Sequence, residues 1–340
     1  YRFDDFGTSA VTLDLAEGGT YIFNMDDSSN ASHPFSIGTA ANGTVYTSGI
    51  TYFLDGVSKT YSEYTSGFAA ATTRRLHITV PASAPVLYYW CSVHSGMGGQ
   101  INTNSTLGSS NFDGSIQSTA KANASAGFSI VSYTGNATSG ATVGHGLGVA
   151  TKVMIVKERG NTNNWPVYHA EIGNTKALYL DLTNDSGGAF TGAWNNTSPT
   201  SSVFSLGNSN ETNRSSGNFI AYCFSEVTGY SKFGSYTGNG SSNGTFVFTG
   251  FRPAWVMVKR YDGGGQGWNI FDNKRNTFNL VDEFLIANSS NAEATGGALN
   301  LDFLSNGFKF RGVDGGSNTS GSDYIYLAFA ESPFKNARAR

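Results

Sequence analysis

Hydrophobic and polar residues alternate in short runs over the first 105 residues of the chain. The pattern is clearest in residues 11–15 and 76–80, where every second side chain is apolar, as in a strand that buries one face. A continuous apolar run, residues 86–90, then leads into Cys91. Short strands separated by Gly, Pro, Ser and Asn predict a small β-sandwich or barrel over residues 1–105.

The apolar pattern fades between residues 106 and 126, where Ser, Asn, Gly and Ala dominate. Such a composition is typical of a linker, because it offers few side chains that could be buried. We therefore predict a linker over residues 106–126, between the first domain and the rest of the chain.

The rest of the chain contains an internal duplication, which constrains its architecture. Four strings recur in the same order: residues 132–136 as 235–239, residues 153–157 as 255–259, residues 165–169 as 268–272, and residues 219–226 as 324–331. Each copy holds several strand-like runs and no convincing helix. The duplication predicts two similar β-sandwich units, over residues 127–230 and 231–340, or one pseudo-symmetric sandwich. The predicted fold class is all-β.

Composition supports this fold class and argues against several functions. Charged residues make up 13% of the chain, aromatic residues 14%, and glycine accounts for 43 of 340 residues, so strand and turn formers replace helix formers. The net charge of −3, without a basic run, argues against a nucleic-acid partner. Apolar runs fall far short of the roughly 18 residues that span a membrane. Two cysteines, Cys91 and Cys223, exclude a disulfide framework and leave one bridge open.

One group of residues in the first domain has the chemistry of a metal site. Cys91, His94 and Met97 form a C-x2-H-x2-M string at the end of a predicted strand, and His33 lies upstream at another strand end. One thiolate, two imidazoles and one thioether are the ligands of a blue-copper centre. Zinc is the main competitor, since it also accepts Cys and His.

The strings at residues 87–99 and 32–35 resemble those of a cupredoxin. The resemblance implies a Greek-key sandwich that binds type 1 copper, with His33, Cys91 and His94 as equatorial ligands and Met97 as the axial ligand. It also implies a backbone N–H donated to the thiolate by the residue after the first histidine. Pro34 occupies that position and has no N–H. A metal-free cupredoxin domain is therefore an alternative.

The remaining chemistry-bearing residues predict no catalytic site. His77 alternates away from an apolar face, His145 lies in a predicted turn, and His169 is replaced by Asp272 in the second copy. No nucleophile elbow, phosphate-binding loop or zinc-protease motif occurs. We expect the protein not to be an enzyme.

The duplicated region resembles a domain that is common in structural proteins of marine tailed bacteriophages, through residues 221–226, 229–239, 249–256, 304–309 and 333–340. The first-domain strings are likewise similar to modules of cyanophage virion proteins. The resemblance implies an extracellular virion component: a fibre, an appendage or a capsid decoration. It implies as partners other copies of the chain in a symmetric homo-oligomer, often a trimer, other virion proteins and a host-surface glycan.

The low charge also favours a surface that other chains partly cover. We expect the loops at residues 208–218 and 313–323 to carry recognition, and a segment before Tyr1 to anchor the chain to the particle. Two further interpretations are a copper-carrying electron-transfer protein fused to an anchoring module, and a secreted bacterial adhesin or filament subunit.

Overall fold

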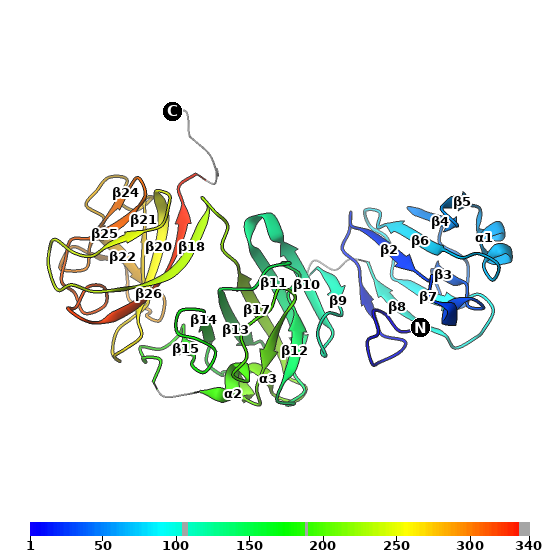
Figure 1. Ribbon diagram of the computed structural model, residues 1–340, viewed down its shortest axis with the longest axis horizontal. Coiled ribbons are helices and arrows are strands. Elements are labelled where there is room, and N and C mark those ends of the chain that lie inside the picture. The colour runs from blue at the N-terminus through cyan, green and yellow to red at the C-terminus, as the bar shows by residue number, and fades with distance from the viewer. Residues whose placement is uncertain (104–107, 188–189, 333–340) are drawn as a thin grey trace. The chain divides into compact units, whose positions relative to one another are not determined.

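The computed structural model describes residues 1–103, 108–187 and 190–332. It forms two compact units, one of Tyr1–Ser115 with Thr119–Lys121 and one of Ile116–Ser118 with Ala122–Arg340. Figure 1 shows that strands dominate both units, so the predicted all-β fold class is confirmed. No helix in these described ranges is long and apolar enough to cross a membrane. The C-terminal string at residues 333–340 lies outside the described residues.

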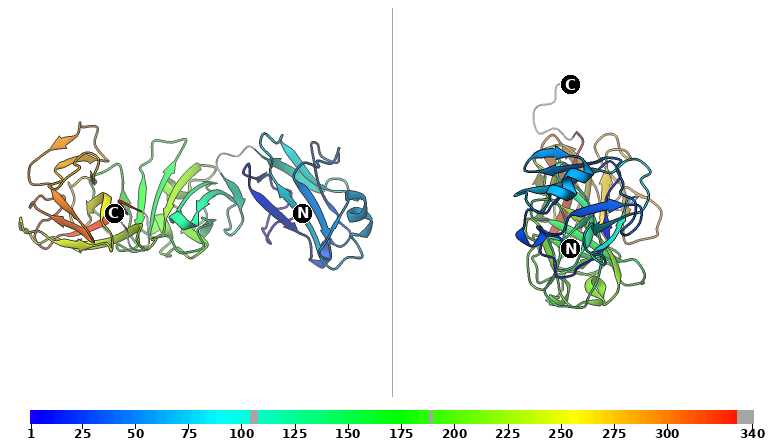
Figure 2. Two further views of the ribbon diagram at one scale, coloured as in Figure 1. Left: turned by 90° about the horizontal axis from the view of Figure 1, so that it is seen from above. Right: turned by 90° about the vertical axis from the view of Figure 1, so that its right-hand side faces the viewer.

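The first unit contains two four-stranded sheets, seen from further directions in Figure 2. One sheet has the order β1-β8-β7-β3 and the other has the order β2-β6-β4-β5. The strands are β1 (Leu13–Asp14), β2 (Thr20–Asn24), β3 (Phe35–Gly38), β4 (Ile50–Leu54), β5 (Val57–Lys59), β6 (Arg74–Thr79), β7 (Leu87–Cys91) and β8 (Gly98–Asn102).

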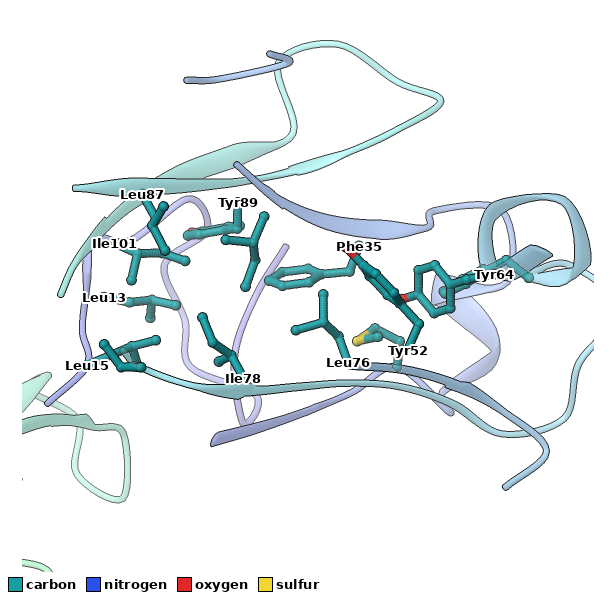
Figure 3. Packing of buried hydrophobic residues seen from close by; sticks show 14 of the residues in the cluster. Leu13, Leu15, Phe35, Tyr52, Tyr64, Leu76, Ile78, Leu87, Tyr89 and Ile101 are labelled. Atoms are coloured by element: carbon teal, nitrogen blue, oxygen red, sulfur yellow. The ribbon is translucent and has the colours of Figure 1, made fainter. Parts of the chain in front are cut away.

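The inner faces of the two sheets form one hydrophobic core (Figure 3). Leu76 and Ile78 of β6 face Leu87 and Tyr89 of β7, and all four side chains are fully buried. On each strand the two buried residues are two apart in sequence, as expected where one face of a strand is buried. Each such side chain contributes about 1.5–3 kcal/mol to folding, so the core firmly supports the loops that join its strands.

A short helix, α1 (Tyr61–Gly67), covers one end of this core. Thr60 and Glu63 form a capping box, in which each side chain accepts a hydrogen bond from the other residue's backbone N–H. Tyr64 and Phe68 are buried beneath the helix. The capping box fixes where the helix begins, and its buried aromatic face attaches it to the sandwich.

Part of the predicted linker is strand. β9 (Ser109–Asn111) and β10 (Ser118–Asn123) lie within residues 106–126 and extend a seven-stranded sheet of order β15-β14-β13-β17-β11-β10-β9. Sheet hydrogen bonds join main-chain groups, so a polar sequence can form a strand at a sheet margin. The polar composition did not predict these two strands, while the boundary between the two compact units falls within residues 106–126.

Each repeat of the second unit contains a large and a small sheet, coloured green in the first repeat and yellow to red in the second (Figure 1). The first repeat has β11 (Phe128–Thr134), β12 (Ala141–Gly144), β13 (Val153–Glu158), β14 (Pro166–His169), β15 (Leu178–Tyr179), α2 (Thr191–Trp194), β16 (Val203–Leu206), α3 (Asn210–Asn213) and β17 (Asn218–Phe224). The second has β18 (Ser231–Thr237), β19 (Phe246–Phe248), β20 (Pro253–Arg260), β21 (Asn269–Asp272), β22 (Glu283–Ile286), β23 (Ala294–Thr295), β24 (Leu301–Leu304), β25 (Gly307–Phe310) and β26 (Asp323–Ala330).

The strand order is the same in the two repeats. The order β15-β14-β13-β17-β11 in the first large sheet corresponds to β22-β21-β20-β26-β18 in the second, and β12-β16 corresponds to β19-β25. Matched tyrosines make matched hydrogen bonds: the hydroxyl of Tyr133 donates to the carbonyl of Thr212, and that of Tyr236 donates to the carbonyl of Ser317, both at 2.7 Å. The two copies thus share both topology and local packing.

The large sheets of the two repeats also share a hydrophobic cluster. Ile325 and Leu327 of β26 pack in a cluster with Val153 and Val167 of the first repeat. The alternate residues Tyr324 and Tyr326 belong instead to the core beside β24 and β25. Both faces of β26 are therefore buried, and the two sandwiches are joined through their large sheets.

Candidate metal centre

Strand pairing brings the predicted metal ligands together. His33 precedes β3, and Cys91 is the last residue of β7, while His94 and Met97 lie in the loop between β7 and β8. β3 and β7 are antiparallel, with Phe35 opposite Cys91. This register places His33, distant in sequence, beside the loop that carries the other three residues.

Three of the four predicted ligands form a compact cluster. The sulfur of Cys91 lies 3.6 Å from Nδ1 of His33 and 3.5 Å from Nδ1 of His94. The three candidate ligand atoms lie within 4.8 Å of one another. Cys91 is buried, His33 is half-buried and His94 is exposed, so the cluster lies at the surface with its thiol on the inner side.

Met97 closes the loop that holds this cluster. Its carbonyl oxygen accepts a hydrogen bond of 2.9 Å from the backbone N–H of Cys91. The Met97 side chain is half-buried and lines the same surface groove as His33. The structure thus places the fourth predicted ligand in the loop that follows Cys91, at the same groove as His33.

The donor atoms fit a single small metal ion. Bonds of about 2.0–2.1 Å to nitrogen and about 2.3 Å to sulfur, at angles near those of a trigonal or tetrahedral ion, separate sulfur from nitrogen by roughly 3.6–3.8 Å. The separations of 3.5 and 3.6 Å agree with this spacing. Two imidazoles, one thiolate and an adjacent thioether favour a soft or borderline metal over magnesium or calcium.

The surroundings of the cluster favour the metal-binding form of His33. Partial burial, followed by the neighbouring His94, lowers the pKa of His33, and neutral imidazole is the form that binds metals. The hydroxyl of Tyr1 donates a 2.7 Å hydrogen bond to the carbonyl of His33. Burial, followed by the proximity of Cys91, raises the pKa of Tyr1. No sequence pattern pointed to Tyr1 as a neighbour of the site.

The cysteine sulfur accepts a backbone hydrogen bond from its own loop. The N–H of His94 lies 3.4 Å from the Cys91 sulfur. Pro34 has no N–H to offer, and its carbonyl instead accepts a 3.0 Å bond from the N–H of Ser92. Pro34 therefore connects the start of β3 to the loop that follows Cys91.

The other histidines and the second cysteine lie outside this cluster. His145 and His169 are fully buried, whereas His77 is half-buried beside Phe53. His145, for which the sequence predicted a turn, directly follows β12 and is enclosed there. Both cysteines are free, so the bridge that the sequence left open is not formed. In the described ranges, only the His33–Cys91–His94 group gathers three potential metal ligands.

The two loops predicted to carry recognition turn inward at their centres. Thr212 and Asn213, within residues 208–218, are fully buried, as are Ser317 and Asn318, within residues 313–323. Their side chains or carbonyls hold neighbouring turns through hydrogen bonds. These central residues are structural, and only the flanks of each loop are accessible.

Comparisons with known proteins identify a family for the second unit. A family model described as a domain of unknown function (DUF7483) matches residues 102–333. No curated protein matches the chain, and no solved structure does. The matched range excludes the four predicted metal ligands.

Proposed function

Because the chain belongs to the DUF7483 family through residues 102–333, a range without the metal-ligand cluster, we propose separate roles for its two units. The first unit binds one copper ion through His33, Cys91 and His94, with Met97 as the weak fourth ligand. The second unit is the structural part of a virion component. Each role has its own support and its own test.

The copper proposal is carried by the two distances from the Cys91 sulfur, 3.6 Å to His33 Nδ1 and 3.5 Å to His94 Nδ1. Copper is favoured over zinc because the fourth candidate is a thioether, a soft and weak donor, where a structural zinc site usually has a fourth Cys or His. When bound, copper supplies one-electron redox chemistry.

The protein's own residues would determine how that ion behaves. Burial of Cys91 restricts access of water to the sulfur, and the N–H of His94 donates to it. Because the His94 ring is exposed, a partner protein could approach this ligand directly. The site is therefore suited to exchange electrons or copper at the surface.

Metal titration of the full chain tests the copper role. After chelation and dialysis, the chain is titrated with Cu(II) and, separately, with Zn(II). We expect one copper per chain and an intense visible absorption band from thiolate-to-copper charge transfer. Cys91→Ser should abolish the band, while Cys223→Ala, in the other unit, should retain it. Stoichiometric zinc binding without a copper-dependent band would contradict the proposal.

The structural role is supported by the tandem β architecture and by the resemblance to phage structural domains. Two sandwiches joined through a shared cluster make a stiff module without disulfides. The exposed apolar side chains Phe248 and Phe278 offer surfaces for other chains. A secreted adhesin or filament subunit would use the same properties.

The source of the assembled protein separates these two alternatives. Purified phage particles and purified cell envelopes are analysed by mass spectrometry, and an antibody against the second unit is used to label intact particles. Peptides and label on particles at a constant stoichiometry are expected. Peptides confined to envelopes or filaments would overturn the virion role and leave the copper test unaffected.

A further inference from the structure

The two repeats differ at one edge of their small sheets. β12 pairs with β16 with Val143 opposite Phe204, and β19 pairs with β25 with Val247 opposite Phe308. Val143 and Val247 are both buried. The strands β12 and β19 are therefore equivalent in position, register and orientation, and their outer edges can be compared directly.

In the first repeat, this outer edge is covered by another segment of the chain. Ile116 forms a parallel bridge with Val143, and its N–H donates a 3.0 Å hydrogen bond to the carbonyl of Thr142. The hydroxyl of Ser118 donates a 2.9 Å bond to the carbonyl of Gly144. The main-chain groups of Thr142 and Gly144 thus point away from β16 and bind an extended segment.

In the second repeat, no described segment of the chain pairs with the corresponding edge. In the described part of the chain, β19 pairs only with β25. Phe246 and Phe248 correspond to Thr142 and Gly144, so their main-chain N–H and carbonyl groups point outward. Their side chains are 43% and 62% exposed, whereas Val247 between them is 5% exposed.

The exposed edge lacks the usual protection against pairing. Edge strands are commonly shielded by charged residues, proline or a bulge, and residues 244–250 contain no charge and no proline. Their sequence, Gly-Thr-Phe-Val-Phe-Thr-Gly, is the same in both directions about Val247. When two such strands pair antiparallel about Val247, each residue lies opposite a residue of the same type.

We propose that β19 pairs antiparallel with β19 of a second copy of the chain, about a two-fold axis through the Val247 pair. Phe246 of each copy then lies opposite Phe248 of the other, which gives two aromatic cross-strand pairs. The outward main-chain groups of both residues become hydrogen-bonded, and the two three-stranded sheets merge into one. The interface is isologous, since the same surface serves both copies.

This inference adds a specific surface to the proposed self-association and is independent of the copper site, which lies in the other unit. A charge-reversal experiment on the full chain tests it by sedimentation velocity. F246K/F248K places lysine opposite lysine across the axis and should shift the dimer to monomer. F246K/F248E places lysine opposite glutamate and should restore the dimer. The variant F278K, at a more exposed phenylalanine outside β19, is the control and should remain dimeric.

Because Phe246 and Phe248 are exposed, these variants should keep the wild-type circular dichroism spectrum. A monomeric wild-type chain at concentrations of tens of micromolar would overturn the proposal. Retention of the dimer by F246K/F248K would do the same, because it would place the interface elsewhere.

Disulfide trapping tests the register. F246C and F248C are prepared separately, with both native cysteines buried, and are oxidised alone and as a mixture. Only the mixture should form a cross-linked dimer, because position 246 faces position 248 of the other copy. Equivalent positions are diagonal and about 7–8 Å apart, beyond usual disulfide reach. Efficient cross-linking of either variant alone would overturn the proposed register. Capture of a synthetic peptide of residues 113–119 by β19, with no dimer formed, would show that the edge binds that segment instead.

Discussion

Asn213 and Asn318 hold equivalent turns in the two repeats through the same pattern of hydrogen bonds. Oδ1 of Asn213 accepts from the N–H of Asn136 at 2.9 Å, and Oδ1 of Asn318 accepts from the N–H of Asn239 at 3.0 Å. In each case, Nδ2 donates to the carbonyl of the glycine six residues earlier, at 2.8 and 2.9 Å respectively. Both side chains are fully buried. Each amide therefore provides hydrogen-bond partners for backbone N–H and carbonyl groups at a turn, in place of a neighbouring strand.

Replacing either asparagine should destabilise the second unit. Asn213→Ala or Asn318→Ala leaves buried N–H and carbonyl groups without partners, and we expect the free energy of unfolding to fall by about 2–4 kcal/mol. Urea denaturation monitored by tryptophan fluorescence provides the measurement. Asn291→Ala, at an exposed position, is the control and should change stability by less than about 0.5 kcal/mol. Equal effects at positions 291 and 318 would contradict this role.

The second unit should lose stability in acid because of His169. The ring is fully buried between the repeats, with Nε2 3.4 Å from the carbonyl of Tyr326. Burial, reinforced by the charge of Lys152, lowers the pKa of His169 to about 4. In the unfolded chain, His169 becomes protonated below about pH 6.5, whereas in the folded chain it stays neutral down to about pH 4. The free energy of unfolding therefore falls as the pH falls from about 6.5 to about 4.

This effect amounts to at most roughly 3 kcal/mol between pH 7 and pH 4. The measurement is the urea midpoint of the second-unit transition across that range. His169→Gln should remove this part of the pH dependence while lowering stability at pH 7. An unchanged slope in His169→Gln would show that other groups cause the acid sensitivity.

Lys157 and Lys259 provide a matched pair for testing burial in the duplicated fold. Nζ of Lys157 donates to the carbonyls of Asn161 and Asn163, and Nζ of Lys259 donates to those of Thr183 and Gln266. Lys259 is fully buried, whereas Lys157 is half-buried. Desolvation lowers the pKa of Lys259 to about 8.

Removing the buried lysine should cost much more than removing its counterpart. We expect Lys259→Ala to lower the free energy of unfolding by about 2–4 kcal/mol, because it leaves a cavity and two unpaired carbonyls. Lys157→Ala should cost less than about 1 kcal/mol, since water can replace its contacts. Parallel urea titrations give both values. The reverse order would contradict the difference in burial between Lys259 and Lys157.

Copper should stabilise the first unit alone. A ligand that binds only the folded state at 100 times its dissociation constant adds about 2.7 kcal/mol. Calorimetry of the full chain should therefore show one transition that rises with Cu(II), falls after chelation and is insensitive to copper in Cys91→Ser. A copper-dependent rise in both transitions would indicate binding outside the His33–Cys91–His94 cluster.

The grouping of the candidate ligands was predictable from sequence to the extent that these residues are local. The spacing of Cys91, His94 and Met97 placed three candidates in one loop. The position of His33 depends on the pairing of Phe35 with Cys91, which no local pattern specifies. Tyr1 reaches the site only through tertiary packing and could not have been predicted.

The sequence predicted the fold class and the duplication, but not how the sheets of the two repeats pack against each other. The repeated strings anticipated the common strand order, whereas the shared cluster around Ile325 depends on how the two sheets pack. A continuous apolar run over β26 indicates burial on both faces, so a signal for that packing was present. Thr60 and Glu63 likewise carried the signal for α1, which the strand pattern obscured.

The alignment of Phe35 with Cys91 also makes the metal cluster a reporter of strand register. A slip of one residue between β3 and β7 would turn alternate side chains to the opposite face and carry His33 away from the thiol. Only chains with these two strands correctly aligned can assemble the complete ligand set. Under the proposed copper role, the colour developed with copper would therefore follow correct folding of the first unit during refolding, separately from the collapse of its hydrophobic core.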